Sequence, residues 1–174
     1  GFTKYTAIPG CIEVREAVCH KFANINRLSY NPSEIIVSNG AKQSIMNAIF
    51  ALINPGDEVI IPTPCWSSYT EIVKLAGGIP MLVKTLAKDN HILQDYQLSK
   101  AISKKTKMVI INYPSNPTGA SISINDLRAL SVVLEKNPNI YIISDDINES
   151  LQWHPDGINN IVNGVYQDYL SEII

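Results

Sequence analysis

Polar and conformationally restricted residues follow a short apolar run near the middle of the chain. The run Met108–Ile111 predicts a buried strand. It leads into the octet Asn112–Gly119, Asn-Tyr-Pro-Ser-Asn-Pro-Thr-Gly, in which two prolines fix the backbone and a glycine allows a turn. The sequence therefore predicts a stiff loop that presents the amide of Asn116, with its N–H donors and its acceptor oxygen, at the end of the strand.

A glycine-containing turn opens a predicted helix nearer the N-terminus. The segment Gly40-Ala41-Lys42 comes directly before a helical pattern that runs from Gln43 to about Ile53. The free N–H groups and positive dipole end of a helix start suit a phosphate group. The turn has neither Gly-x-Gly-x-x-Gly nor Walker spacing, which argues against a dinucleotide or ATP site.

Two further residues whose side chains could bind a ligand come shortly after predicted strands. Trp66 follows the strand Glu58–Ile61, and Asp145 follows the strand Asn139–Ile143. Ligands of open α/β sheets bind beyond the carboxyl ends of the strands, and parallel strands all end on the same side. Four residues are therefore expected at one edge of the sheet: Gly40, Trp66, Asn116 and Asp145.

The elements that must position these residues alternate along the chain. Further helices are expected over Ile12–Phe22, Trp66–Ala76 and Asp95–Ile102, and from a cap at Ser123 or Asn125 through Lys136. Further strands are expected over Glu34–Val37 and Ile79–Val83, while the assignment of Tyr166–Ile174 stays open. Alternation of helices with short apolar strands is typical of an α/β fold with three layers, a mostly parallel sheet and helices on both faces.

Size and composition restrict the class of protein. A chain of 174 residues, 45% hydrophobic and 17% charged, fits a single globular domain. The net charge of −2 and the lack of a basic stripe argue against a nucleic-acid partner. The three cysteines show no Cys-x-x-Cys spacing, which favours a reducing compartment and no metal site. No apolar run has transmembrane length and no signal pattern is visible, so we predict a cytoplasmic protein with no membrane partner.

The octet Asn112–Gly119 resembles the Asn-Pro-Thr-Gly loop of the class I/II aminotransferases. That family has the aspartate aminotransferase fold (fold type I) and uses pyridoxal 5'-phosphate. The resemblance implies that Asn116 hydrogen-bonds the phenolic oxygen of this cofactor. The turn Gly40-Ala41-Lys42 resembles the family's phosphate cup, in which backbone amides hold the cofactor phosphate.

Two other segments extend the resemblance to the cofactor ring. The run Pro64–Tyr69 resembles the segment whose aromatic ring stacks on the pyridine face, which gives that role to Trp66. Trp66 and Asn116 would also border the substrate. Asp145 matches the aspartate that keeps the pyridine nitrogen protonated, so that the ring withdraws electrons from the substrate.

Two more positions carry weaker implications. Asn148 stands where the family usually has a tyrosine that also bonds the phenolic oxygen. An asparagine amide is shorter and does not ionise, so the resemblance implies a weaker effect on the pKa of the bound cofactor or a shifted reaction preference. Tyr5 resembles a tyrosine that reaches the cofactor phosphate of the neighbouring subunit, which implies a homodimer.

The resemblance runs from Lys4 to about Trp153 and implies a partial cofactor-binding large domain over residues 1–174. The N-terminal arm, the catalytic-lysine segment and the C-terminal small domain of the family are not matched. In the family the lysine that forms the Schiff base with the cofactor stands in a Ser-x-x-Lys segment. Several lysines of this chain lack that context: Lys42, Lys100, Lys104 and Lys136. We expect the catalytic lysine beyond Ile174, no catalytic residue within the chain, and no activity of this chain alone.

The activity implied by the resemblance is transfer of an amino group between an amino acid, most of all aspartate, and a 2-oxo acid. A pyridoxal-phosphate-dependent lyase or synthase of the same fold is one alternative, which the departure at Asn148 keeps open. A non-catalytic domain that senses pyridoxal phosphate is a second alternative. A nucleotide-binding α/β domain is a third, and it lacks its glycine fingerprint.

Overall fold

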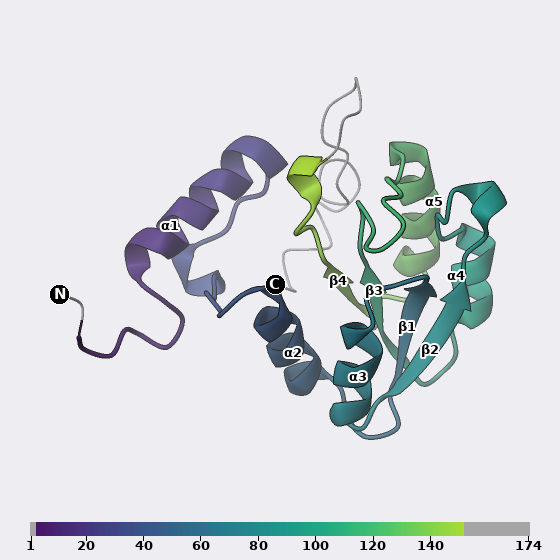
Figure 1. The fold of residues 1–174 in the computed structure, drawn as a ribbon, viewed down its shortest axis with the longest axis horizontal. Coiled ribbons are helices and arrows are strands. Elements are labelled where there is room, and N and C mark those ends of the chain that lie inside the picture. Colours follow the sequence, from purple (N-terminus) through teal and green to yellow (C-terminus); the bar gives the residue numbers. More distant parts are fainter. Residues whose placement is uncertain (1–2, 152–174) are drawn as a thin grey trace.

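The computed structural model describes residues 3–151, in which helices and strands alternate along most of the chain (Figure 1). The α-helices are α1 (Ile12–Lys21), α2 (Ala41–Leu52), α3 (Ser68–Leu75), α4 (Asp95–Ala101) and α5 (Ile124–Glu135). The strands are β1 (Glu58–Thr63), β2 (Ile79–Lys84), β3 (Thr106–Ile111) and β4 (Tyr141–Ser144). One π-helical turn (Phe22–Asn26) and three short 3-10 turns (Pro32–Glu34, Ala87–Asp89 and Glu149–Leu151) complete the described elements. The segment Tyr166–Ile174 lies outside the described residues.

The strands form one parallel sheet in the order β2-β1-β3-β4. The chain passes from β1 outward to β2, then crosses back to place β3 on the other side of β1 and continues to β4. The direction of winding therefore reverses between β1 and β3. In open α/β sheets the crevice at such a reversal, outside the carboxyl ends of the strands, is where ligands bind.

Both faces of the sheet are covered, which confirms the predicted three-layer α/β architecture (Figure 1). On one face Val59 and Ile61 of β1 pack in one cluster with residues of α2 and α3. On the other face Ile60 of β1 packs with residues of α4 and α5. All three β1 side chains are at most 1% exposed. Strands buried on two faces need apolar side chains at every position, which explains the unbroken apolar runs in the sequence.

The prediction of a strand over Glu34–Val37 is wrong. The first residue of this segment ends a 3-10 turn, and the backbone that follows is extended but joins no sheet in the described residues. Its N–H at Val37 donates to the carbonyl of Pro9 at 2.9 Å, and Ile36 is 69% exposed. The sequence therefore has a β-type run without a partner strand, and Gly40 follows a loop and not a strand.

Predicted helices and the other strands are confirmed, with small differences at their ends. The helix predicted from Trp66 begins at Ser68, so Trp66 lies in the loop after β1. The helix predicted from Gln43 begins two residues earlier, at Ala41. The start of α5 is capped by Ser123, whose Oγ accepts from the N–H of Asp126 at 3.1 Å.

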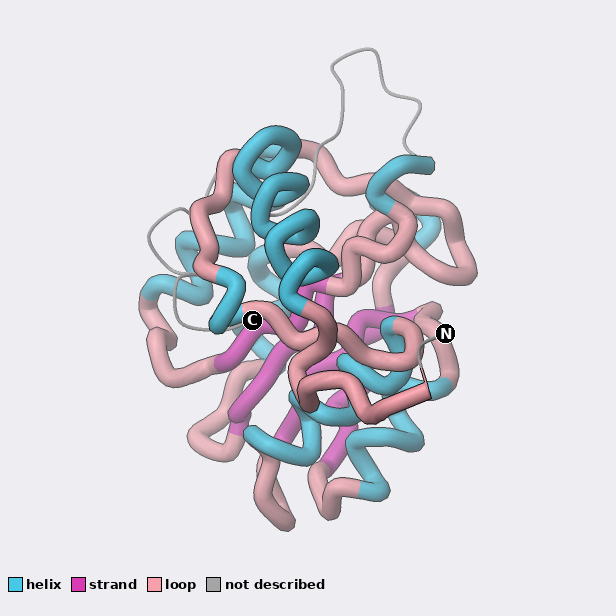
Figure 2. Tube along the Cα trace, turned by 90° about the vertical axis from the view of Figure 1, so that its left-hand side faces the viewer, coloured by secondary structure: helices cyan, strands magenta, loops and turns pink. Residues whose placement is uncertain are grey.

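Helix α1 stands apart from the sheet (Figure 1), and the side view shows it with the N-terminal segment on the near side of the strands (Figure 2). None of its residues is buried. The segment after it is anchored, because Leu28 is 6% exposed and belongs to the core on the α4–α5 side of the sheet.

Candidate functional site

The predicted site residues gather at the carboxyl ends of the strands. Trp66 lies three residues after the end of β1, and Asp145 is the first residue after β4. The loop that carries Asn116 begins directly after β3. The turn at Gly40 is at the same edge, because α2 leads from it to the opposite end of the sheet, where β1 begins. The loops after β1 and β3 flank the point at which the winding reverses.

A chain of side-chain contacts joins the start of α2 to the end of β4. The Lys42 ammonium lies 5.0 Å from the centroid of the Trp66 ring. The rings of Trp66 and Tyr69 meet edge to face, with centroids 5.3 Å apart and an interplanar angle of 89°. The hydroxyl of Tyr69 then donates a hydrogen bond of 2.5 Å to Oδ2 of Asp145.

The loops after β3 and β4 are joined by two asparagine side chains. Oδ1 of Asn112 accepts from the backbone N–H of Asn116 at 2.9 Å, and its Nδ2 donates to the backbone oxygen of Asp145 at 2.8 Å. Nδ2 of Asn148 donates to the carbonyl of Pro114 at 3.1 Å. The amide donor of Asn148 is therefore used to hold the two loops together.

Asp145 is a buried carboxylate held by two donors. The residue is 9% exposed, and besides the Tyr69 hydroxyl it accepts the backbone N–H of Ile147 at 3.2 Å on Oδ1. Burial raises the pKa of Tyr69 above its usual value, and the hydrogen bond to Asp145 raises it further. Tyr69 thus keeps its proton at every ordinary pH and stays a hydrogen-bond donor to Asp145. A buried carboxylate of this kind favours a positively charged group in contact with it.

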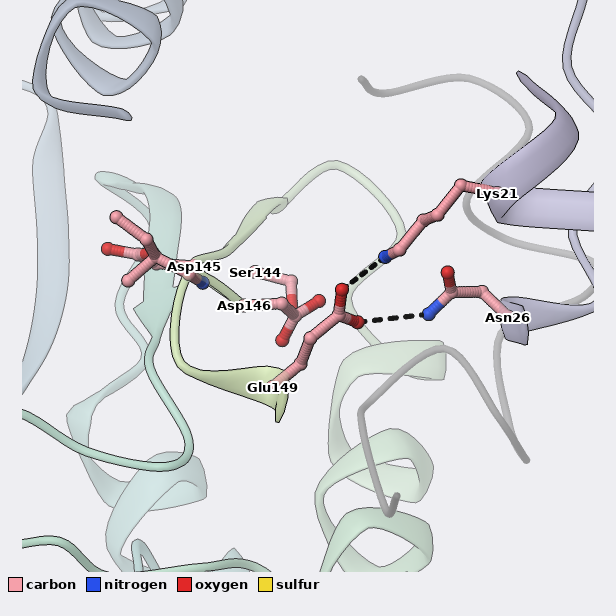
Figure 3. A network of polar contacts seen from close by, with 7 residues as sticks. Lys21, Asn26, Ser144, Asp145, Asp146 and Glu149 are labelled. Carbon is pink, nitrogen blue, oxygen red and sulfur yellow. Dashed lines mark hydrogen bonds and ion pairs between the residues drawn. The ribbon is translucent and has the colours of Figure 1, made fainter. Parts of the chain in front are cut away.

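A second polar network lies beside the first, on the side of α1 (Figure 3). One oxygen of Glu149 forms an ion pair with Lys21, and the other accepts from Nδ2 of Asn26 at 3.3 Å. The hydroxyl of Ser144 lies 3.0 Å from both oxygens of Asp146. Burial raises the pKa of Asp146 to about 6, and the nearby charge of Glu149 adds to this shift.

The start of α2 is a turn in which Gly40 adopts a positive φ. Gly40 has φ +84° and ψ 161°, and no atom lies within 4 Å of the position that a Cβ would take. The N–H groups of Ala41 and Lys42 are in the first helical turn, where the helix itself offers no acceptor. Ala41 is half-buried and Lys42 is exposed.

Tyr5 lies apart from this cluster. Its side chain is fully exposed in the segment before α1. Its predicted contact with a neighbouring subunit stays a prediction. Among residues 3–151, no group of three or more histidine, cysteine or acidic side chains is arranged to hold a metal ion.

Comparison with known proteins shows the family of this chain. The family described as aminotransferase class I and II matches residues 1–163. The chain belongs to this family. Its members depend on pyridoxal phosphate, and they use amino acids and oxo acids as substrates.

Curated relatives are much longer than this chain. An aspartate/prephenate aminotransferase of Nitrosomonas europaea is 45% identical over 163 residues, which are 94% of this chain and 41% of that protein. An aspartate aminotransferase of Pinus pinaster is 42% identical over 89% of this chain and 32% of its own length. The chain therefore spans about two fifths or less of these relatives.

Solved structures share the fold closely. The aspartate aminotransferase of Rhizobium meliloti matches with a TM-score of 0.89 and 40% identity, over 99% of this chain and 42% of that chain. An aromatic aminotransferase of Pyrococcus horikoshii matches with a TM-score of 0.86 and 36% identity, over 92% and 43%. Within residues 3–151, no helix combines the length and apolarity needed to cross a membrane.

Two residues of the cluster were not assigned a role from sequence. Tyr69 lies in the predicted aromatic run and Asn112 begins the predicted loop, yet neither was expected to contact Asp145. The signal available for Asn112 was its type and place, an amide side chain directly after a strand. For Tyr69 the signal was its spacing, one helical turn beyond Trp66.

Proposed function

We propose that the chain is the cofactor-binding part of a longer, pyridoxal-phosphate-dependent aminotransferase. The observation that carries this proposal is the chain of contacts from Lys42 through Trp66 and Tyr69 to Asp145, continued by Asn112 to Asn116. These contacts link residues at the start of α2, in the loops after β1 and β3 and at the end of β4, which supports one shared ligand site. These residues carry the donor, acceptor and stacking groups that a phosphorylated pyridine ring requires.

Each group has a role that follows from its chemistry. The first-turn N–H groups of Ala41 and Lys42 would bind the phosphate. The face of Trp66 would support the ring, and the amide of Asn116 would bond the phenolic oxygen. Asp145 would hold a proton on the ring nitrogen. When bound, the cofactor supplies an electron-withdrawing ring for cleavage of bonds at the amino acid Cα.

Other parts of the mechanism are assigned to the longer protein. We propose that the lysine that binds the cofactor covalently and moves the substrate proton lies outside residues 1–174. The C-terminal small domain is assigned there as well. The relatives are more than twice as long as this chain, which leaves room for both. We also propose a homodimer in which Tyr5 reaches the partner's site, with Asn148 contributing to the phenolic side of the cofactor.

Aspartate is the proposed amino donor, because aspartate is named in the relatives from Nitrosomonas europaea and Pinus pinaster. The test is an assay of the full-length protein with aspartate and either 2-oxoglutarate or prephenate, in which oxaloacetate is measured. Parallel reactions use tyrosine or phenylalanine as donor. Formation of oxaloacetate, dependent on added pyridoxal phosphate, is expected. Release of ammonia and pyruvate from cystathionine, supplied in a separate reaction, would instead identify a lyase.

The chain of 174 residues should show no turnover by itself. Borohydride reduction in the presence of pyridoxal phosphate should label no single lysine rapidly. A rapid, stoichiometric adduct on one lysine of this chain, accompanied by turnover, would contradict the assignment of the catalytic lysine to another segment.

A further inference from the structure

Asn112 joins the two loops that carry Asn116 and Asp145. It is half-buried and is the first residue after β3. Its acceptor oxygen is bonded to the Asn116 backbone at 2.9 Å, and its amide nitrogen to the Asp145 backbone at 2.8 Å. One planar side chain therefore bonds the backbones of two proposed cofactor contacts that come from neighbouring strands.

The bonds of Asn112 lie where the sheet has ended. The last backbone bond between β3 and β4 runs from the N–H of Asp145 to the carbonyl of Ile111, at 2.8 Å. Beyond it the chain turns into the loop that contains Pro114, which has no N–H to donate. The Asn112 amide thus adds one more bond between the two segments after the ladder stops.

The two bonded residues differ in how else they are held. The Asp145 carboxylate is fixed from the far side by the Tyr69 hydroxyl. The side chain of Asn116 is exposed, so its placement depends on its own backbone, which Asn112 holds. We infer that Asn112 is a positioning residue that sets the separation of Asn116 and Asp145. This inference rests on the proposed function and adds to it a residue that need not touch the cofactor.

The bond to Asp145 can be removed alone, or both bonds can be removed together. Asn112→Asp keeps an oxygen for the N–H of Asn116 but replaces the donor to the Asp145 carbonyl. Asn112→Ala removes both bonds. A matched control is Asn137→Ala, because Asn137 is also half-buried, and its Nδ2 donates to the carbonyl of Val133 at 2.8 Å. Asn137 precedes β4, so it lies at the opposite end of the sheet.

The experiment uses the full-length protein after removal of the cofactor. Dissociation constants for pyridoxal phosphate are measured by titration, well below the melting temperature of every variant, and melting is recorded separately. Both Asn112 variants should raise the dissociation constant at least tenfold, whereas Asn137→Ala should change it less than twofold. Deuterium uptake of the cofactor-free loop around Asn116 should rise in Asn112→Ala but much less in Asn112→Asp, which keeps that bond. In the enzyme loaded with pyridoxal phosphate, the fold decrease in kcat should exceed the fold change in KM.

The possible outcomes separate the two claims. If the unsubstituted protein binds the cofactor and both Asn112 variants bind it within twofold of Asn137→Ala, the positioning role is overturned while the proposed function stands. If the unsubstituted protein does not bind pyridoxal phosphate, the proposed function fails and this inference fails with it. Should Asn112→Ala not fold, Asn112→Asp decides the matter with the same thresholds.

Discussion

Among single residues, Asp145 shows how a buried charge is kept in place by donors from other parts of the chain. Its two carboxylate oxygens receive a hydroxyl from α3 and a backbone N–H from its own loop. Hydrogen bonds to a charged group contribute about 1.5–3 kcal/mol each. Removal of one donor should therefore be measurable both in stability and in cofactor binding.

Tyr69→Phe removes the hydroxyl that donates to Asp145. The unfolding free energy of the full-length protein should fall by about 1.5–3 kcal/mol, because the carboxylate loses a charge-assisted bond. Affinity for pyridoxal phosphate should fall as well. Tyr141→Phe is the control, since Tyr141 is at the start of β4, away from the site. Equal cofactor affinities of the two variants, measured by titration, would show that the Tyr69 hydroxyl does not support the site.

Asp146 predicts a pH dependence of stability. Its pKa in the folded protein is about 6, against about 3.9 when unfolded, so the folded state binds more protons between these values. Stability from this carboxyl is therefore full below about pH 4 and is lost as pH rises through about 6. Asp146→Asn should raise the unfolding free energy by about 1–3 kcal/mol at pH 7.5 and have little effect at pH 4. Urea unfolding over this pH range measures the difference, and a constant difference at every pH would contradict the expected role of Asp146.

The sequence predicted where the proposed site residues lie in the fold better than it predicted which side chains they contact. Trp66, Asn116 and Asp145 could be predicted because each stands in a recognisable loop shortly after a strand. The bond between Tyr69 and Asp145 spans 76 positions, and that between Asn112 and Asp145 spans 33. Contacts at such separations depend on how elements pack, and no local pattern in one sequence records that packing.

Among the elements, the start of α2 depends on one backbone conformation. Gly40 combines a φ of +84° with a ψ of 161°, a region that is open almost only to glycine and costs other residues about 1–3 kcal/mol. A side chain would meet no neighbouring atom there. The requirement for glycine is therefore conformational and not one of space.

Gly40→Ala should strain or rearrange the turn and misplace the N–H groups of Ala41 and Lys42. We expect a loss of stability of about 1–3 kcal/mol, together with weaker binding of both pyridoxal phosphate and free phosphate. Gly56→Ala is a close control, since Gly56 also has a positive φ (+91°) and open space, but lies in the turn before β1. Calorimetric titration of both variants distinguishes them. Phosphate binding unchanged in Gly40→Ala would remove this turn from the site.

Helices and strands were predicted correctly where the local sequence pattern agrees with the packing of the fold. The prediction failed where a strand depends on a neighbouring strand to pair with. The apolar runs of β1 and β3 were correctly predicted because burial on two faces demands them. The run Glu34–Val37 has the same β-type composition and even an extended backbone, but a strand is defined by its neighbour. The cap of α5 was narrowed to Ser123 or Asn125, and only the geometry selects Ser123.

For the whole molecule, α1 is attached to the site loop by a small number of polar contacts. It contributes no buried residue, and the ion pair of Lys21 with Glu149 links its end to the loop after β4 (Figure 3). Glu149 follows Asp145 by only four residues. The ion pair thus links α1 to the loop that carries Asp145.

Lys21→Met removes this ion pair. Global stability should change by about 1 kcal/mol or less, but deuterium uptake in α1 and in the loop after β4 should rise while β1 and β3 remain protected. Lys74→Met is the control, because it breaks an ion pair with Glu71 that is exposed on α3. A uniform increase of uptake over the whole sheet in Lys21→Met would show that α1 is instead part of the core.

The parallel sheet also has a consequence for engineering the molecule. Because all strands point the same way, the turns that precede β1, β2, β3 and β4 share the end remote from the cofactor residues. Chain breaks or inserted peptides at that end, for example next to Gly56 or Asn137, should leave every bond of the proposed site intact. Split-protein reporters and affinity tags should therefore be inserted there, because the loops after β1, β3 and β4 carry the residues of the proposed site.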